Sequence, residues 1–289
     1  MADVMEERVR SIQLCAGVTF ALSALILSIC LALYPTLAPA NQTNLILDAL
    51  SKQDVGGWMW LHAWMVVGFL LSTVAFTAFA FLLHLRGSSG AASITSVSAL
   101  VGGGIWATFL SMELFVGPFL KSYYPIDPGL ATMLFTTVWF WKMGALAVGA
   151  TLLFMAVISA GTAGVTREVI PIWMGWGGAL FGVVGILVYL FEFWTATATG
   201  SAINPMRGAG VRYGVGLPIQ LWMIGVGATL LRDWRSKAVA LPPQMRTPVP
   251  PKRDVRPEPR PDPKPDPMKK PTGSLADFPP APPLPPPIP

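Results

Sequence analysis

Charged residues are scarce in this sequence. Asp, Glu, Lys and Arg make up 12% of its 289 residues, whereas soluble domains carry about 25%. Hydrophobic residues make up 53%, and long runs before residue 240 contain almost no charge. A membrane span needs about 20 apolar residues to cross the hydrocarbon. The composition therefore predicts several spans and excludes an ordinary soluble domain.

Cysteine and histidine are also nearly absent, which excludes several familiar chemistries. Cys15 and Cys30 lie in one predicted helix, about 22 Å apart, too far for a disulfide. The two histidines, His62 and His84, stand about 33 Å apart at opposite ends of another predicted helix, so a bis-histidine haem is excluded. The sequence has no haem, nucleotide or flavin signature, and no hydrolase or Cys-x-x-Cys motif nominates a catalytic residue.

The hydrophobic runs predict an all-α fold, a bundle of six transmembrane helices within residues 1–237. We expect the third span to stop at Gly117-Pro118 and a turn to lie between Gly161 and Glu168. The first run is longer than the apolar part of a signal peptide, which favours a retained anchor over a cleaved one. The six predicted spans cover residues 12–34, 58–84, 94–117, 131–158, 169–195 and 214–231.

Proline is concentrated at the C-terminal end, where 20 of the 28 prolines follow Ala240. Between Arg256 and Pro267 proline alternates with charged residues, a pattern that prevents helix and sheet formation. We therefore expect residues 238–289 to be a disordered, proline-rich tail of low complexity. The run Pro282–Pro287 resembles ligands of proline-binding proteins, so such a protein is a possible partner of the tail.

Basic residues beside the spans predict the sidedness of the chain. Seven of them flank one side of the predicted bundle and four flank the other. Because basic residues favour the cytoplasmic side, both termini are predicted to be cytoplasmic in a plasma (inner) membrane. The positions of the basic residues at span ends argue against nucleic acid as a partner. Trp58, Trp60 and Trp194 are expected at the outer boundary of the lipid bilayer.

Small residues recur along the predicted spans, as in Gly178-x-x-x-Gly182, Ala145-x-x-x-Gly149 and Gly102–Gly104. Small residues let helix backbones approach one another in a membrane. The pattern predicts a tightly packed bundle, with glycine-softened moving helices as the alternative.

Four polar residues inside the spans form the candidate site. Charged residues within a membrane are costly and usually mark a function or a buried pair. The predicted sidedness puts all of them in the outer half of the bilayer, on four different helices. These residues are His62, Glu113, Lys142 and Glu192.

The chemistry of this polar site has three interpretations. In the first, Lys142 forms a structural ion pair with Glu113 or Glu192, and His62 is interfacial. In the second, the carboxylates and the imidazole bind protons beside an outward, water-filled cavity. In the third, His62, Glu113 and Glu192 bind a divalent metal, which the nearby Lys142 ammonium opposes.

Three functions accordingly stay open. The leading hypothesis is a small-solute or ion carrier, or a sensor, that uses the polar site. A membrane anchor or scaffold that recruits a partner through its tail is the second. A metal-dependent membrane enzyme is the third, although no sequence motif supports catalysis. Neither a substrate nor an oligomeric state follows from the sequence.

Overall fold

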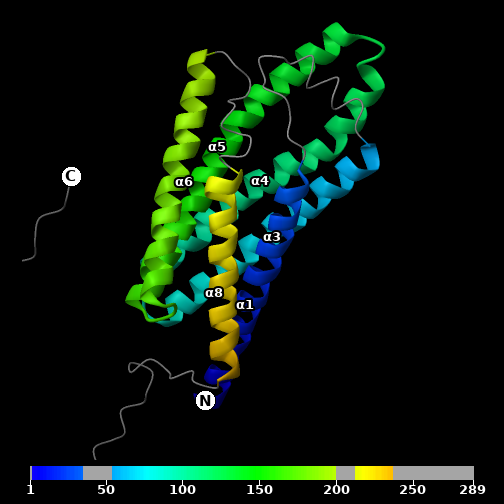
Figure 1. Cartoon of the computed structure of the whole chain (residues 1–289). Coiled ribbons are helices and arrows are strands. Elements are labelled where there is room, and N and C mark those ends of the chain that lie inside the picture. Colours follow the sequence, from blue (N-terminus) through cyan, green and yellow to red (C-terminus); the bar gives the residue numbers. More distant parts are fainter. Residues whose placement is uncertain (1, 35–53, 200–211, 237–289) are drawn as a thin grey trace, which may run out of the picture. The chain divides into compact units, whose positions relative to one another are not determined.

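The structure, a computed structural model, describes residues 2–34, 54–199 and 212–236, and these residues are helical apart from short turns (Figure 1). The predicted tail and the segments 35–53 and 200–211 lie outside the described residues. The elements are α1 (Ala2–Leu33), α3 (Val55–Leu85), α4 (Ser89–Tyr123), α5 (Pro128–Thr166), α6 (Ile172–Thr199), the π-helical turn η2 (Arg212–Gly216) and α8 (Leu217–Arg235).

Six of these helices are long and apolar enough to cross a membrane. Their apolar segments are Glu6–Leu33, Val55–Leu85, Ser89–Leu120, Gly144–Thr166, Ile172–Phe191 and Gly214–Arg235. Large apolar side chains such as Leu187 and Leu180 are more than 60% exposed on the bundle surface, as expected for surfaces that face lipid. The chain is therefore an all-α, polytopic membrane protein, and the predicted fold class is confirmed.

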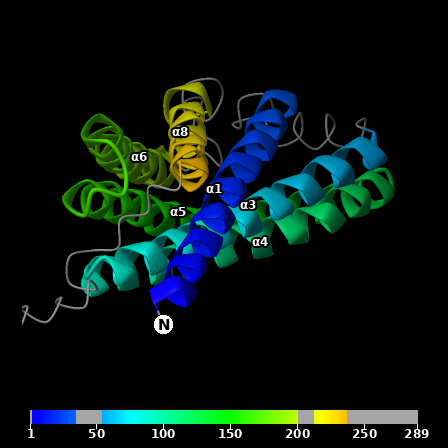
Figure 2. The same cartoon turned by 90° about the horizontal axis from the view of Figure 1, so that it is seen from below.

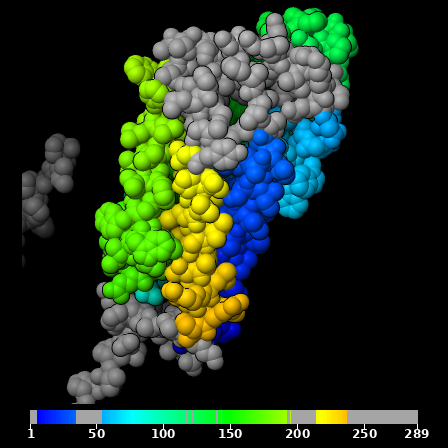
Figure 3. All heavy atoms as spheres, in the orientation of Figure 1, coloured from blue at the N-terminus to red at the C-terminus, as the bar shows by residue number. Residues whose placement is uncertain are grey.

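Each helix packs against the next one along the chain, and α8 returns to pack against α1. Seen from below, α1 and α8 lie side by side, with α4 and α5 on the other side of the bundle (Figure 2). On the face shown in Figure 3, α8 lies between α1 and α6. It contacts α1 along its length but α6 only sparsely.

The two ends of the helical bundle are marked by specific contacts. The Arg10 guanidinium on α1 donates to the Trp234 carbonyl on α8, which puts the first and last described helices together at one end. At the same end, Arg167 donates to the Gly87 carbonyl, joining the α5–α6 turn to the α3–α4 turn. We call this the terminal end. The α4–α5 turn lies at the opposite end (Figure 1).

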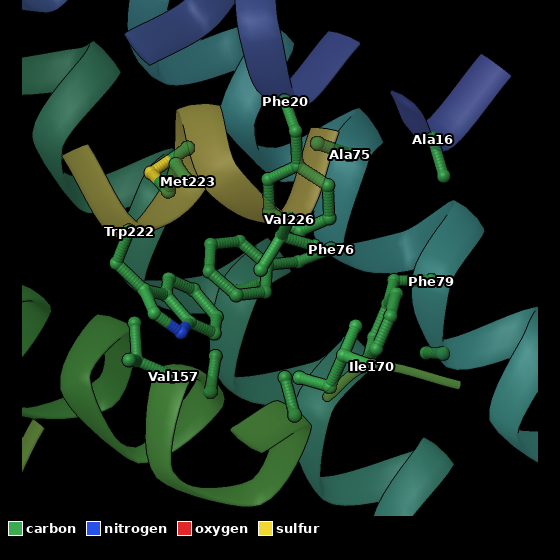
Figure 4. Packing of buried hydrophobic residues seen from close by; sticks show 14 of the residues in the cluster. Ala16, Phe20, Ala75, Phe76, Phe79, Val157, Ile170, Trp222, Met223 and Val226 are labelled. Atoms are coloured by element: carbon green, nitrogen blue, oxygen red, sulfur yellow. The ribbon is translucent and has the colours of Figure 1, made fainter. Parts of the chain in front are cut away.

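Aromatic side chains from three helices form the centre of the core (Figure 4). Phe20 of α1 meets the Phe76 ring of α3 edge-on, with ring centroids 5.0 Å apart. Phe76 also stacks on Trp222 of α8. The Trp222 indole donates to the Met174 carbonyl of α6 over 2.8 Å, so its buried polar atom is satisfied. This core joins α1, α3, α6 and α8.

Glycines allow the close helix contacts that their spacing predicts. A Cβ atom on Gly102 would lie 2.7 Å from the Gly149 carbonyl oxygen, a distance that only glycine permits. Gly161 approaches Gly175 in the same way. Gly161 was predicted to begin a turn, but α5 continues to Thr166. Gly161 therefore lies within α5, where the absence of a side chain lets α5 pack closely against α6.

At the end opposite the terminal end, α4 and α5 extend beyond their predicted spans, as do α3 and α6. Helix α4 continues through Pro118 to Tyr123. A proline removes one hydrogen bond of the helix, which membrane helices tolerate. Helix α5 begins at Pro128, where the Asp127 side chain accepts from the Leu130 amide and caps it.

Candidate functional site: a buried Lys–Glu–His cluster

His62 lies fully buried on α3, two turns from the start of the helix. Its Nδ1 atom is 2.9 Å from the Trp58 carbonyl oxygen, one turn earlier in the same helix. A carbonyl oxygen only accepts hydrogen bonds, so Nδ1 must carry a proton. In the neutral imidazole, Nε2 then has a lone pair and is an acceptor.

Glu113 of α4 joins His62 to a cation. Its Oε2 atom is 3.0 Å from His62 Nε2, and its Oε1 atom forms an ion pair with the Lys142 ammonium of α5. Glu113 is 8% exposed and Lys142 7% exposed. One carboxylate thus connects three helices, with a cation on one oxygen and an imidazole on the other. We call His62, Glu113 and Lys142 the polar cluster.

The contact between Glu113 and His62 has no proton between its two facing atoms. Nε2 has no directed hydrogen bond with any described residue, although Oε2 is only 3.0 Å away. With the imidazole neutral, an acceptor nitrogen faces a carboxylate oxygen that also only accepts. One added proton, on the ring or on the carboxyl group, together with a small rotation that aligns the two groups, would turn this contact into a hydrogen bond. The polar cluster therefore provides a place for one proton.

Trp58 holds the polar cluster together from α3. Its indole Nε1 donates to the Glu113 main-chain carbonyl oxygen over 2.9 Å, across the α3–α4 interface. Its ring lies against His62, with centroids 4.1 Å apart. Tyr34, which directly follows α1, meets the same imidazole edge-on, with ring centroids 5.7 Å apart. The aromatic rings thus cover the histidine from two directions.

The predicted aromatic belt needs one correction. Trp60 and Trp194 are 56% and 69% exposed, as expected of residues that face the interfacial region. Trp58, which was assigned to the same belt, is buried beside His62. The spacing of four residues between Trp58 and His62 puts both on one helix face, and this signal could have identified Trp58 as part of the site.

The fourth predicted site residue, Glu192, lies on α6, and its side chain is outside the described part of the structure. The described residues contain no group of three His, Cys, Asp or Glu side chains that could hold a metal ion. Within the polar cluster, a metal would find two ligands, Glu113 and His62. One oxygen of Glu113 is already paired with the Lys142 ammonium.

The polar cluster lies toward the end of the bundle that carries the α4–α5 turn. His62 lies 23 residues from the terminal end of α3 at Leu85, and Glu113 lies 24 residues from that of α4 at Ser89. Lys142 lies 24 residues from the terminal end of α5 at Thr166. At 1.5 Å per residue, about 35 Å of helix separates the cluster from the terminal end.

Fold and site together define the class of protein: an integral membrane protein with six apolar helices and a buried ionisable cluster between α3, α4 and α5. Comparison of the chain with protein-family models, curated proteins and solved structures gives no match.

Proposed function

We propose that this protein is a proton-coupled carrier of a small solute, with the polar cluster as its proton-binding site. The observation that supports the proposal most directly is the contact between His62 Nε2 and Glu113 Oε2, two acceptors 3.0 Å apart within a buried ion-pair network. Glu192, on a neighbouring helix, is proposed as a further member of the site.

A purely structural ion pair explains the polar cluster less well. Lys142 and Glu113 would satisfy each other without a histidine. A buried polar atom that lacks a hydrogen bond costs about 1–3 kcal/mol, and His62 Nε2 is such an atom. An apolar residue at position 62 would avoid this cost. A proton-binding role gives a reason for the imidazole.

Proton binding would change the forces between α3, α4 and α5. Before a proton binds, the Glu113 carboxylate balances the charge of the Lys142 ammonium, so the polar cluster is neutral overall. A proton shared by Glu113 and His62 gives it a net charge of one and weakens the attraction between Glu113 and Lys142. Because that pair joins α4 to α5, its weakening favours a rearrangement of these helices. A carrier needs such a coupling between occupancy and conformation.

The sidedness of the site is part of the proposal. With both termini in the cytoplasm, the terminal end faces inward and the polar cluster lies toward the outer surface. Protons and solute would then reach the cluster from outside. The plasma (inner) membrane is the proposed location.

Currents from proteoliposomes on a solid-supported membrane would test the carrier. Single solutes are applied at two external pH values: acetate, benzoate, methylammonium, glycine, glucose and phenol. We expect at least one to evoke a current that rises in acid, and Glu113→Gln to abolish it. Glu168→Gln, in the exposed α5–α6 turn, is the matched control and should keep it. Currents that are absent for every solute, or unchanged by Glu113→Gln, would refute the carrier and favour the scaffold hypothesis.

A further inference from the structure

A partly open cavity of about 160 Å³ is lined by residues of all six long helices. On α3, Met65 and Phe69 line it, one and two turns beyond His62 on the same helix face. On α4, Trp106 lines it, seven residues from Glu113. The cavity therefore lies on the terminal-end side of the polar cluster, and none of the three cluster residues is among those that line it.

The cavity is apolar and rich in aromatic rings. Phe69 and Trp106 stack with centroids 4.9 Å apart on one side of it. Two methionines, which adapt their shape to a ligand, also line it. The full lining is Leu27, Leu31, Met65, Phe69, Ser72, Phe76, Trp106, Ala150, Leu153, Phe154, Val157, Tyr189, Gly216, Ile219, Gln220 and Met223.

The volume limits what the cavity can hold. An apolar cavity of about 150 Å³ in another protein stays free of water and binds benzene. A cavity of about 160 Å³ is thus suited to one six-membered ring with a small substituent. It is too small for most drug-sized molecules, whose pockets measure about 300–1,000 Å³.

Two lining residues contain a buried polar atom without a hydrogen-bond partner among the described residues: Nε1 of Trp106, a donor, and Oε1 of Gln220, an acceptor. A hydroxyl group can accept from the indole and donate to the amide oxygen at once. Both atoms are covered by neighbouring atoms of the protein, so the indole or the amide must rotate slightly to reach a ligand.

One wall of the cavity is formed by α6, η2 and α8. Tyr189 of α6, Gly216 of η2 and Gln220 of α8 line it here, and α6 and α8 contact each other sparsely. The preceding turn, η2, is π-helical, a geometry often found at functional sites.

We propose that this cavity binds one ring-sized, largely apolar molecule that carries a hydroxyl group, such as a phenol. That such a molecule is also the transported solute rests on the proposed carrier function. Binding itself does not, because it depends on cavity size and on Trp106 and Gln220.

Fluorine NMR of 4-fluorophenol with the protein in lipid nanodiscs tests the proposal. Empty nanodiscs give the signal of the probe dissolved in lipid. We expect an additional, saturable signal with one site per chain. Ala150→Leu, which fills the cavity, should weaken binding at least about tenfold. Val148→Leu, on the lipid-exposed face of the same helix, should leave it unchanged. A signal that never saturates, or equal binding by both variants, would overturn the proposal.

Two further measurements keep the proposal testable should Ala150→Leu fail to fold. Gln220→Met preserves side-chain length but removes the acceptor. We expect it to weaken 4-fluorophenol about tenfold while leaving fluorobenzene unchanged. Equal effects on both probes would show that Gln220 does not bind the hydroxyl group. Saturable 4-fluorophenol binding by the unmutated protein, with no current for any solute, would refute the carrier alone. Transport of another solute without 4-fluorophenol binding would refute the cavity proposal alone.

Discussion

The Trp58 indole donates to the main-chain carbonyl oxygen of Glu113 over 2.9 Å, while the Trp58 carbonyl oxygen faces His62 Nδ1. One tryptophan thus makes polar contacts with two members of the polar cluster: its side chain donates to Glu113, and its main-chain carbonyl faces His62. The donor at Nε1 belongs to the side chain alone, so a mutation can remove it without changing the backbone contact with His62.

Trp58→Phe is expected to destabilise the fold by about 1–3 kcal/mol, because it removes one buried hydrogen bond and part of a buried ring. Unfolding in mixed micelles with increasing SDS measures this loss. Trp60→Phe, two residues along the same helix but exposed, is the control and should cost less than about 0.5 kcal/mol. Equal losses for both variants would show that the Trp58 contact contributes nothing.

Lys142→Met should destabilise more strongly, by about 3–5 kcal/mol, because it leaves the buried Glu113 charge without a partner. The double variant Lys142→Met/Glu113→Gln removes both charges and should recover most of the loss. The same SDS unfolding assay compares the two. A double variant that is less stable than Lys142→Met would contradict a mutual ion pair.

Gly102→Ala should cost about 1–3 kcal/mol, because the new methyl group would overlap the Gly149 carbonyl and force α4 and α5 apart. Gly104→Ala, two residues away on the same helix, has open space at the same position. That variant should be neutral or up to about 1 kcal/mol more stable, since alanine favours helix. If the two variants have the same free energy of unfolding, α4 and α5 do not approach each other closely at Gly102.

Ser159→Ala should destabilise more than Thr95→Val. The Ser159 hydroxyl accepts from Thr95 and donates to the Ala91 carbonyl, each over 3.0 Å, so it takes part in two bonds between α4 and α5. Hydrogen bonds between membrane helices contribute about 0.6 kcal/mol each. Thr137→Val, whose hydroxyl bonds only within its own helix, is the control. If Thr95→Val lost more stability than Ser159→Ala, the assignment of two interhelical hydrogen bonds to Ser159 would be wrong.

The sequence allowed the fold class to be predicted because each span needs a long apolar run, and such runs are visible without an alignment. Helix ends were less predictable. Pro118 and Gly161 are residues that end helices in water, yet here one lies within α4 and the other packs against α6. Within a bilayer, a helix that ends early leaves backbone N–H and C=O groups without water to bind. Continuing the helix through a proline or a glycine costs less free energy than that.

For the site, the rarity of charge within the spans identified His62, Glu113 and Lys142, which the structure brings into contact. Their role in proton binding stays a prediction, as does that of Glu192. Trp58 was missed because tryptophan near a span end usually faces the interfacial region. The cavity could not be foreseen, since it depends on the relative rotation of all six helices, which a single sequence does not specify.

The length of helix between the terminal end and the polar cluster has a consequence for the choice of membrane. The hydrocarbon layer is about 30 Å thick, whereas this length is about 35 Å, or about 33 Å along the membrane normal at a typical tilt of 20°. The cluster would then lie close to the hydrocarbon boundary. Hydrophobic mismatch should decide whether headgroups and water reach it or acyl chains surround it. Lipid chain length would thereby set the strength of the Lys142–Glu113 pair, and short-chain and long-chain bilayers would hold the same protein with its ion pair hydrated or dry.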